Sequence, residues 1–323
     1  METQTLPLKP IGGYIELQLN PGRIFHSELL PLNTGRNALE YILRVRKYNL
    51  IYLPYYTCDV LLEPLHKLNV ACKFYKIDQD LNPIIDFEIA EKSCFLYTNY
   101  YGLKTETINK LARSIPNLIV DNAQAFFEQP LQHIDTFYSC RKFFGVPDGA
   151  YLSISNTLDI TLEQDLSLNR FSHLLKSIDL NIEEGYTDYI ENNKDLCNRD
   201  IMQMSSLSTQ ILAGINYGQC ALIRQENFDF LHEHLASKNL LKLSRASAAV
   251  PMVYPLLLPV SGIKQKLIAQ KIFVATYWPN VIDWVEKDSF EYFLTHNLIA
   301  LPIDHRYNID DMTTMVNILN TLL

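Results

Sequence analysis

The chain has 323 residues, a length that favours about two domains and allows a large core without metal ions or disulfides as supports. Hydrophobic residues make up 48% of the sequence and charged residues 20%, which is the balance of a folded globular protein and excludes a disordered or fibrous chain. The formal net charge of -8 and the lack of a run rich in Lys and Arg argue against nucleic acid as a partner.

Signals for a membrane, for secretion and for metals are missing from the sequence. The strongest apolar run, Ala248–Val260, is shorter than the roughly 18 residues of a spanning helix and contains three prolines. Met1–Pro10 lack the basic start and apolar block of a secretory signal. The six cysteines include no CxxC pair, which argues against a zinc site and a disulfide framework. We therefore expect a cytoplasmic protein that neither enters a membrane nor binds a metal.

The first two thirds of the sequence alternate short β-rich runs with helical stretches. Strands are predicted at Asn49–Pro54, Ala71–Ile77, Ser93–Thr98, Asn117–Val120, Thr136–Ser139 and Ala150–Ile154. Helices are predicted at Arg36–Arg46, Cys58–Leu68 and Lys104–Ser114. Strands separated by helix-length connections indicate an α/β domain with a mostly parallel sheet covered by helices.

The pattern changes from about residue 201 onwards. One long helix or two in tandem are predicted over Met204–Leu235, where apolar residues recur at helical spacing without proline. Further elements are predicted in the order strand, helix, strand, helix: within Val250–Val260, Gly262–Gln270, Ile272–Tyr277 and Ile309–Leu322. Asn308, Asp310 and Asp311 supply the chemistry of a helix start for the last one.

These elements indicate a smaller α+β domain after the α/β domain. We place the boundary between residues 1–203 and 204–323, so that the second domain begins with the long helix. Trp278 and Trp284 are expected to pack the smaller domain. Residues 185–200 show little periodicity and are expected to form loops.

The segment Leu118–Gly149 carries the most informative polar residues. One predicted strand runs into Asp121, and the next ends at Ser139, three residues before Lys142. Because ligands bind at the carboxyl ends of strands in an α/β sheet, these side chains are expected to meet in one crevice. Lys142 beside Arg141 has the crowded, cationic setting that suits an amine attacking carbonyl groups.

An amine of this kind forms a Schiff base with an aldehyde cofactor such as pyridoxal 5'-phosphate (PLP). PLP also needs a carboxylate opposite its ring nitrogen, and Asp121 is the candidate. Its phosphate needs donors at a helix N-terminus, which Thr34, Gly35 and Arg36 provide ahead of a predicted helix. Ser139 adds a hydroxyl group from the other side.

Each of these residues also has a purely structural interpretation. Lys142 would be a solvated surface lysine, although its aromatic neighbours disfavour this. Asp121 would cap a helix that begins near Ala123. Gly35 would be an ordinary turn glycine. The coincidence of all three favours the cofactor site.

Three further residues are candidates for contact with a substrate. Arg306 suits a carboxylate or a phosphate group, and an ion pair with Asp304 or Asp310 is an equally open alternative. Tyr100 and Tyr101 either line the substrate crevice or pack in the core.

Seven blocks of the sequence resemble, in order, the landmarks of the sugar aminotransferases with the aspartate-aminotransferase fold, the DegT/DnrJ/StrS type. The blocks are LNTGRNAL (32–39), LPYYTCDVLLEPL (53–65), YKIDQDLN (75–82), NYYG (99–102), VDNAQA (120–125), SCRKFFGVPDG (139–149) and ALPIDHRYNIDDM (300–312). The resemblance covers nearly the whole chain. Its specific part is the DxAQ block followed by a lysine ahead of a glycine-rich turn.

The resemblance implies a three-layer PLP-transferase-like large domain and a smaller C-terminal domain. Lys142 matches the lysine that forms the Schiff base and moves the proton, and Asp121 matches the acid on the pyridine nitrogen. Gln124 matches the position that contacts the cofactor ring or its 3-hydroxyl group. Gly35 and Arg36 match the backbone that holds the phosphate, with Ser139 assisting.

The resemblance also implies a homodimer with the cofactor site at the interface. The implied reaction transfers an amino group from an amino acid, glutamate, to a nucleotide-linked keto sugar, for polysaccharide or glycoconjugate synthesis. Loops that bind the nucleotide are expected around Gly185–Asp200. For the asparagine that crosses between subunits, Asn198 is the candidate.

The sequence departs from the family's pattern at two positions. Cys58 stands where many members place an aromatic ring over the cofactor, so Tyr56 is the alternative stacking residue. Phe137 stands where many members have the phosphate serine, so the assignment of Ser139 rests on a shorter SxxK spacing. These departures, and a short chain for the family, motivate a non-catalytic relative as one alternative. A sugar dehydratase variant is another, which Lys142 disfavours because those members have histidine there.

Overall fold

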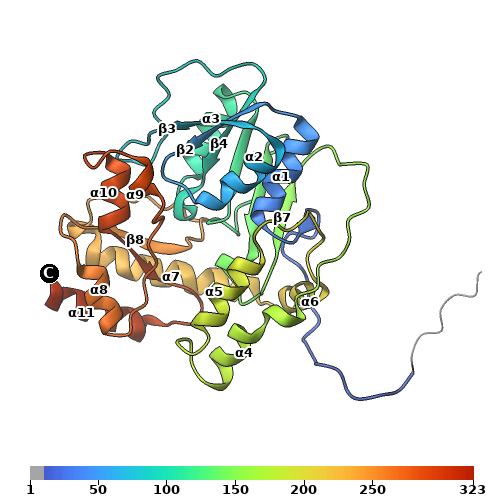
Figure 1. The fold of residues 1–323 in the computed structure, drawn as a ribbon. Helices are drawn as coiled ribbons and strands as arrows, with labels where there is room; N and C mark the ends of the chain where they lie inside the picture. Colours follow the sequence, from blue (N-terminus) through green and yellow to red (C-terminus); the bar gives the residue numbers. More distant parts are fainter. Residues whose placement is uncertain (1–10) are drawn as a thin grey trace, which may run out of the picture.

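The structure is a computed structural model that describes residues 11–323. The prediction about a secretory signal falls on Met1–Pro10 and lies outside the described residues. A central seven-stranded sheet is covered by helices on both faces, and a two-stranded sheet with its own helices lies beside it (Figure 1). Every helix in residues 11–323 is too short or too polar to cross a bilayer.

The large sheet has the strand order β1-β7-β6-β5-β4-β2-β3. The strands are β1 Leu30–Leu32, β2 Leu50–Pro54, β3 Ala71–Tyr75, β4 Ser93–Thr98, β5 Leu118–Asn122, β6 Asp135–Ser139 and β7 Ala150–Ser153. Strands β2 to β6 pair in parallel, whereas β7 and β1 add an antiparallel edge. The predicted α/β class and the six predicted strands of this region are confirmed. Strand β1 was missed because three residues carry no periodicity.

Two helices, α1 (Gly35–Arg46) and α2 (Leu62–Leu68), cover one face of the large sheet. They share an apolar cluster with the sheet in which Leu39, Ile42 and Leu65 are almost fully buried. The opposite face carries α3 (Thr105–Ser114) and a second cluster that reaches into the C-terminal part of the chain. The three helices predicted in this region are confirmed, with the second beginning as a 3-10 turn.

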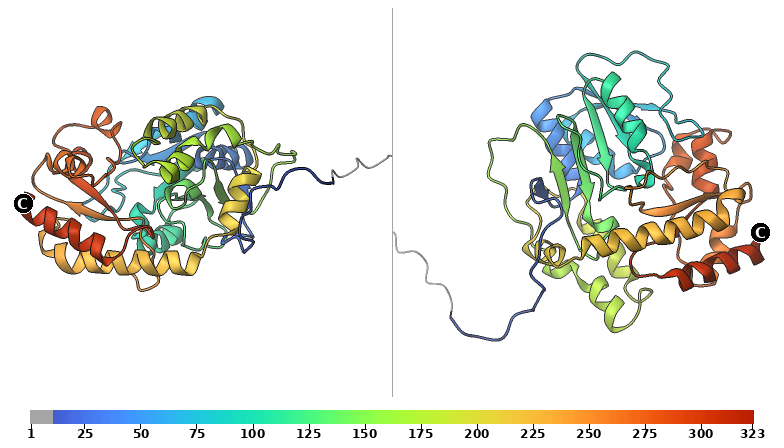
Figure 2. Two further views of the ribbon diagram at one scale, coloured as in Figure 1. Left: turned by 90° about the horizontal axis from the view of Figure 1, so that it is seen from below. Right: turned by 180° about the vertical axis from the view of Figure 1, so that it is seen from behind.

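The C-terminal part is built around β8 (Val253–Leu257) and β9 (Leu298–Pro302), which pair antiparallel. Its helices are α6 Ser206–Ala213, α7 Tyr217–Leu235, α8 Ile263–Ala269, α9 Val281–Trp284, α10 Phe290–Asn297 and α11 Ile309–Leu322. The two tandem helices and the terminal helix are as predicted. Helix α11 lies alongside α7 (Figure 2), and it begins at a capping box of Asn308 and Asp311.

Two predictions about this half of the chain are wrong. Residues 272–277 form no strand, and only Ala275 makes a bridge, to Ala300 of β9. Residues 185–200 are not loops throughout, because α5 (Tyr186–Asp195) occupies most of them and packs on α4 (Ser172–Asp179). These two helices form a projection below the large sheet (Figure 1).

Candidate active site

Lys142 lies in a 3-10 turn, Cys140–Lys142, directly after β6. The turn is closed by backbone bonds from the N–H groups of Phe143 and Phe144 to the carbonyl oxygen of Cys140, at 3.0 and 2.9 Å. Both phenylalanine rings are buried, whereas Lys142 is exposed in the isolated chain. The aromatic neighbours therefore anchor the turn and leave the amine outside the core.

A buried arginine from the C-terminal part packs against this turn. Arg224 of α7 is 1% exposed, and its guanidinium lies 4.7 Å from the centre of the Phe143 ring. It donates hydrogen bonds to the carbonyl oxygen of Met252 at 3.0 Å and, more weakly, to that of Phe143 at 3.4 Å. The sequence carried no signal for this contact, because the two segments meet only in the folded chain.

Asp121 lies near the carboxyl end of β5, next to β6 in the sheet. It is almost fully buried, and one carboxylate oxygen accepts a hydrogen bond from Ala123 N–H at 2.8 Å. Burial raises the pKa of the Asp121 carboxyl group, while the positive charge of Lys142 acts in the opposite direction. The two strand ends therefore place this carboxylate in the electrostatic field of Lys142. No helix begins at Ala123, so the interpretation of Asp121 as a helix cap is wrong.

Gln124 is fully buried beside this acid. Its side-chain oxygen accepts a hydrogen bond from Tyr101 N–H at 2.8 Å. Its amide nitrogen is buried and has no hydrogen-bond partner within residues 11–323. A buried donor without a partner costs about 1–3 kcal/mol, so the site is suited to a ligand that brings an acceptor to this nitrogen.

The start of α1 offers donors for an anion. The Thr34 hydroxyl accepts a hydrogen bond from Asn37 N–H at 3.2 Å, so the N–H groups of Gly35 and Arg36 are the remaining donors of the first turn. The Arg36 side chain is already engaged, with its guanidinium 2.6 Å from the Glu63 carboxylate. Only its backbone is therefore available, and Ser139 lies half-buried at the end of β6.

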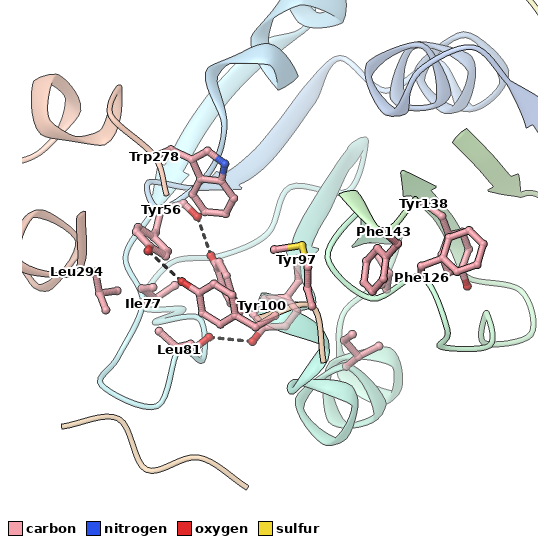
Figure 3. Packing of buried hydrophobic residues seen from close by; sticks show 14 of the residues in the cluster. Tyr56, Ile77, Leu81, Tyr97, Tyr100, Phe126, Tyr138, Phe143, Trp278 and Leu294 are labelled. Carbon is pink, nitrogen blue, oxygen red and sulfur yellow. Dashed lines mark hydrogen bonds between the residues drawn. The ribbon is translucent and has the colours of Figure 1, made fainter. Parts of the chain in front are cut away.

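Tyr56, Tyr100 and Tyr101 are fully buried, and Tyr56 forms hydrogen bonds with the other two. Tyr56 and Tyr100 lie side by side in Figure 3. The hydroxyl groups of Tyr56 and Tyr101 are 3.0 Å apart, and the Tyr100 hydroxyl donates to the carbonyl oxygen of Tyr56 at 3.0 Å. Burial raises the pKa of all three phenols, so they stay neutral. We call these three side chains the buried tyrosine layer. They expose no surface to a substrate in the isolated chain.

The two tryptophans, which were expected to pack the smaller domain, also pack on the large domain. Trp284 packs on Phe74 of β3, with ring centres 5.1 Å apart. Trp278 packs edge-on against Tyr56, and its ring centre lies 6.0 Å from Lys142 Nζ. Both rings therefore join the C-terminal part to the large sheet. Nothing in the unpatterned sequence around Trp278 indicated its place beside the lysine.

Two other predicted residues have partners of their own within the chain. Arg306 forms a two-point ion pair with Asp304, at 2.6 and 2.9 Å, and its side chain is 57% exposed. The Asn198 backbone N–H donates to Glu63, the carboxylate that also binds Arg36. Asn198 thus lies near the start of α1 in its own chain. The described residues contain no cluster of three potential metal ligands.

No family model and no curated protein matches the sequence. Many solved structures match the fold. A sugar aminotransferase from Streptococcus pneumoniae in its PMP form has a TM-score of 0.61 at 13% identity, over 90% of this chain and 86% of that chain. A DegT DnrJ EryC1 StrS aminotransferase from Brucella abortus has a TM-score of 0.62 at 14% identity, over 91% and 85%. The aminotransferase TlmJ from Streptoalloteichus hindustanus has a TM-score of 0.62 at 11% identity, over 90% and 84%.

The structural match shows a common fold. At identities this low, the reaction has to be argued from the residues of the site. The match extends over about nine tenths of the chain, and it includes the seven-stranded sheet that positions Asp121 and Lys142. The chain therefore has the fold of the PLP-dependent sugar aminotransferases of the DegT/DnrJ/EryC1/StrS type.

Proposed function

We propose that this protein is a PLP-dependent aminotransferase that moves an amino group from an amino acid, glutamate, to the keto group of a nucleotide-linked sugar. The observation that carries the proposal is the pairing of a buried acid with an amine at adjacent strand ends, Asp121 and Lys142. The unpaired amide of Gln124 beside them supplies a third, independent requirement of the same cofactor.

Each group has a defined task in this proposal. Bound PLP supplies an electron sink at the carbon that exchanges its amino group. Lys142 Nζ would hold the cofactor aldehyde and would accept and return the proton at the reacting carbon. The Asp121 carboxylate would keep a proton on the ring nitrogen. Gln124 Nε2, a buried donor without a partner in the described residues, would be available to the ring's 3-hydroxyl oxygen.

The phosphate group would be held at the start of α1. The Thr34 cap accepts only the N–H group of Asn37, so the N–H groups of Gly35 and Arg36 remain available. The helix dipole favours an anion at this end of α1. Thr34 fixes the geometry of that turn, and the Ser139 hydroxyl adds a donor from the end of β6. Arg306 is not included, since Asp304 already neutralises its charge.

The wider assignments follow from the same proposal. Residues 1–203 form the cofactor-binding domain and 204–323 the smaller domain. Lys142 is exposed in the isolated chain, whereas amine chemistry of this kind requires exclusion of water, so we propose a homodimer that covers the site. The enzyme works in the cytoplasm, in polysaccharide or glycoconjugate synthesis.

The test is to add PLP to the purified protein, record the absorbance spectrum, reduce with borohydride and map the modified peptide. We expect one reduced adduct, on Lys142, and no adduct in K142A. Lys264 is the sharpest competitor, because it is a buried amine whose pKa burial lowers to about 8. An adduct on Lys264 or on surface lysines would contradict the proposal and leave a non-catalytic relative of the same fold.

A further inference from the structure

Trp278 reaches the candidate site from the far end of the chain. It precedes α9, it is 7% exposed, and its ring centre is 6.0 Å from Lys142 Nζ. The ring packs edge-on against Tyr56 with a centre-to-centre distance of 5.0 Å (Figure 3). The indole of Trp278, from the C-terminal part, therefore lies next to the Lys142 amine of the large domain.

Two polar contacts hold the segment that follows Trp278. The Asn280 side-chain amide donates to the carbonyl oxygen of Thr57 at 3.0 Å, which ties the loop to the segment between β2 and α2. The N–H group of Val281 donates to the carbonyl oxygen of Trp278 at 3.1 Å. The chain that follows Trp278 thus ties the indole to the large domain.

Asn280 is hydrogen-bonded to the segment between β2 and α2. Within the described residues, this segment places no aromatic ring over Lys142 Nζ. Cys58 follows Thr57, is half-buried, and lies close enough that the charge of Lys142 lowers the pKa of its thiol against the stronger effect of burial. A thiol side chain is small, and the Tyr56 ring is fully buried in a T-shaped contact with the indole. The aromatic surface beside Lys142 is therefore that of Trp278.

We propose that Trp278 is a cofactor-contact residue, whose indole packs against the PLP ring held on Lys142. This inference rests on the proposed function. Only one carbon separates Lys142 Nζ from the cofactor ring, so a ring attached there lies within reach of the indole. Contact between two aromatic rings stabilises a complex beyond the effect of the buried area, and an indole also attracts a neighbouring cationic nitrogen.

The first test uses the fact that the chain has two tryptophans, Trp278 and Trp284. W284F leaves Trp278 as the only indole, and W278F leaves Trp284, which packs on Phe74 of the edge strand β3. We expect PLP to quench the emission of W284F more strongly than that of W278F, because energy transfer to the cofactor falls steeply with distance. Equal quenching in the two variants, or stronger quenching in W278F, would overturn the proposal.

The second test separates cofactor contact from packing. W278L keeps an apolar side chain without an aromatic face, W278F keeps the face, and W284L is the matched control. We expect PLP to dissociate about tenfold faster from W278L than from the parent, while W278F and W284L stay within about threefold. If W278L lowers the melting temperature but releases PLP at the parent rate, Trp278 only packs the domains and the proposal is wrong.

Failure of the proposed function gives a different result. In that case the parent protein itself forms no reducible adduct on Lys142, whatever residue occupies position 278. An adduct on Lys142 with no effect of W278L on PLP release would instead leave the proposed function intact and remove Trp278 from the cofactor site.

Discussion

Asp121 is a carboxyl group that the folded chain holds in an unfavourable place. It is almost fully buried and has one backbone donor, from Ala123, and burial raises its pKa although the charge of Lys142 lowers it. A buried carboxylate of this kind does not increase the free energy of unfolding, but it can bind a ligand that needs a fixed negative charge. Its location is best explained by function.

The raised pKa sets the sign of the effect on stability. Between the ordinary value of 3.8 and the raised value, the folded chain binds more protons at Asp121 than the unfolded chain does. The contribution of this group to the free energy of unfolding therefore falls as the pH rises through that window. Above that window the folded state bears the whole penalty of the buried charge.

We predict that D121N stabilises the cofactor-free protein at neutral pH and removes aminotransferase activity. Asparagine keeps an oxygen for the Ala123 N–H group and removes the buried charge, so the melting temperature should rise. Activity should fall at least about 100-fold, because a neutral amide cannot hold the proton on the ring nitrogen. Thermal unfolding and kcat/KM check the two parts. A less stable variant with full activity would contradict both.

His26 gives a pH dependence of the opposite sign. It is 4% exposed, its Nε2 lies 2.6 Å from the carbonyl oxygen of Phe126, and burial lowers its pKa to about 4 from 6.5. Between these values the unfolded chain binds the extra proton. The contribution of His26 to stability is therefore complete above pH 6.5 and is lost as the pH falls towards 4.

We predict that H26Q flattens the loss of stability between pH 6.5 and 4. The full span corresponds to about 3 kcal/mol in the parent, and glutamine can still donate to Phe126. The measurement is the urea midpoint as a function of pH. H66Q, at an exposed histidine of α2, should keep the parent's profile. Identical slopes in the parent and H26Q would contradict the assignment.

At the scale of elements, buried strands were predictable because the residues that favour them, and the turn residues that end them, lie within the same short stretch of sequence. Strand β4, which is buried along its whole length, was placed to the residue. Residues 272–277 carry a similar pattern, but pairing is a tertiary property, and only Ala275 reaches a neighbouring strand. Helix α5 escaped prediction because Asn192 is its only buried residue, which leaves no apolar stripe to detect.

The link between the lysine turn and α6 depends on another buried acid. Asp148 is fully buried and accepts hydrogen bonds from Ser205 N–H at 2.8 Å, from the Ser205 hydroxyl at 2.7 Å and from the Ser208 hydroxyl. Ser205 is the residue that caps α6. A single carboxylate therefore joins the glycine-rich turn after Lys142 to the first helix of the C-terminal part.

We predict that D148A lowers the free energy of unfolding by about 3 kcal/mol, because it leaves two buried hydroxyl groups and a helix N-terminus without their acceptor. D159A, at an exposed position in the loop after β7, should stay within about 0.5 kcal/mol of the parent. Urea unfolding measures both. Equal midpoints for the two variants would show that other acceptors replace the carboxylate.

On the scale of the molecule, the sequence indicated the acid and the amine of the site because adjacent strand ends hold them, and it indicated the helix N-terminus because the turn before α1 is local. Asp121 and Lys142 lie in one continuous segment, and the sheet order brings β5 beside β6. Trp278 and Arg224 could not be predicted, since their contacts with the site arise from packing of the C-terminal part on the large sheet. The large sheet therefore supplies the chemical groups, and the C-terminal part supplies their surroundings.

One surface of the molecule is unusually apolar for a chain that works alone. It lies on the projection formed by α4, α5 and the segments around them, and we call it the α4–α5 surface. Its exposed apolar residues are Leu166, Leu168, Leu175, Ile178, Leu180, Ile182, Tyr186 and Tyr189. Clusters of this kind mark interaction sites. Because Lys142 is also exposed in the isolated chain, the proposed homodimer would bury both.

We predict that I178D converts the proposed dimer into a monomer of 37.3 kDa and weakens PLP retention at least about tenfold. Ile178 is 80% exposed, so the substitution leaves the core of the isolated chain unchanged, whereas a charge buried at an interface is strongly unfavourable. I268D, at a 43% exposed position on α8, makes the same chemical change away from this surface and should stay dimeric. Light scattering of the purified proteins measures the mass, and borohydride reduction measures the adduct on Lys142. A dimeric I178D would show that the α4–α5 surface is not the interface, and a monomeric I178D that retains PLP like the parent would show that one chain completes the site.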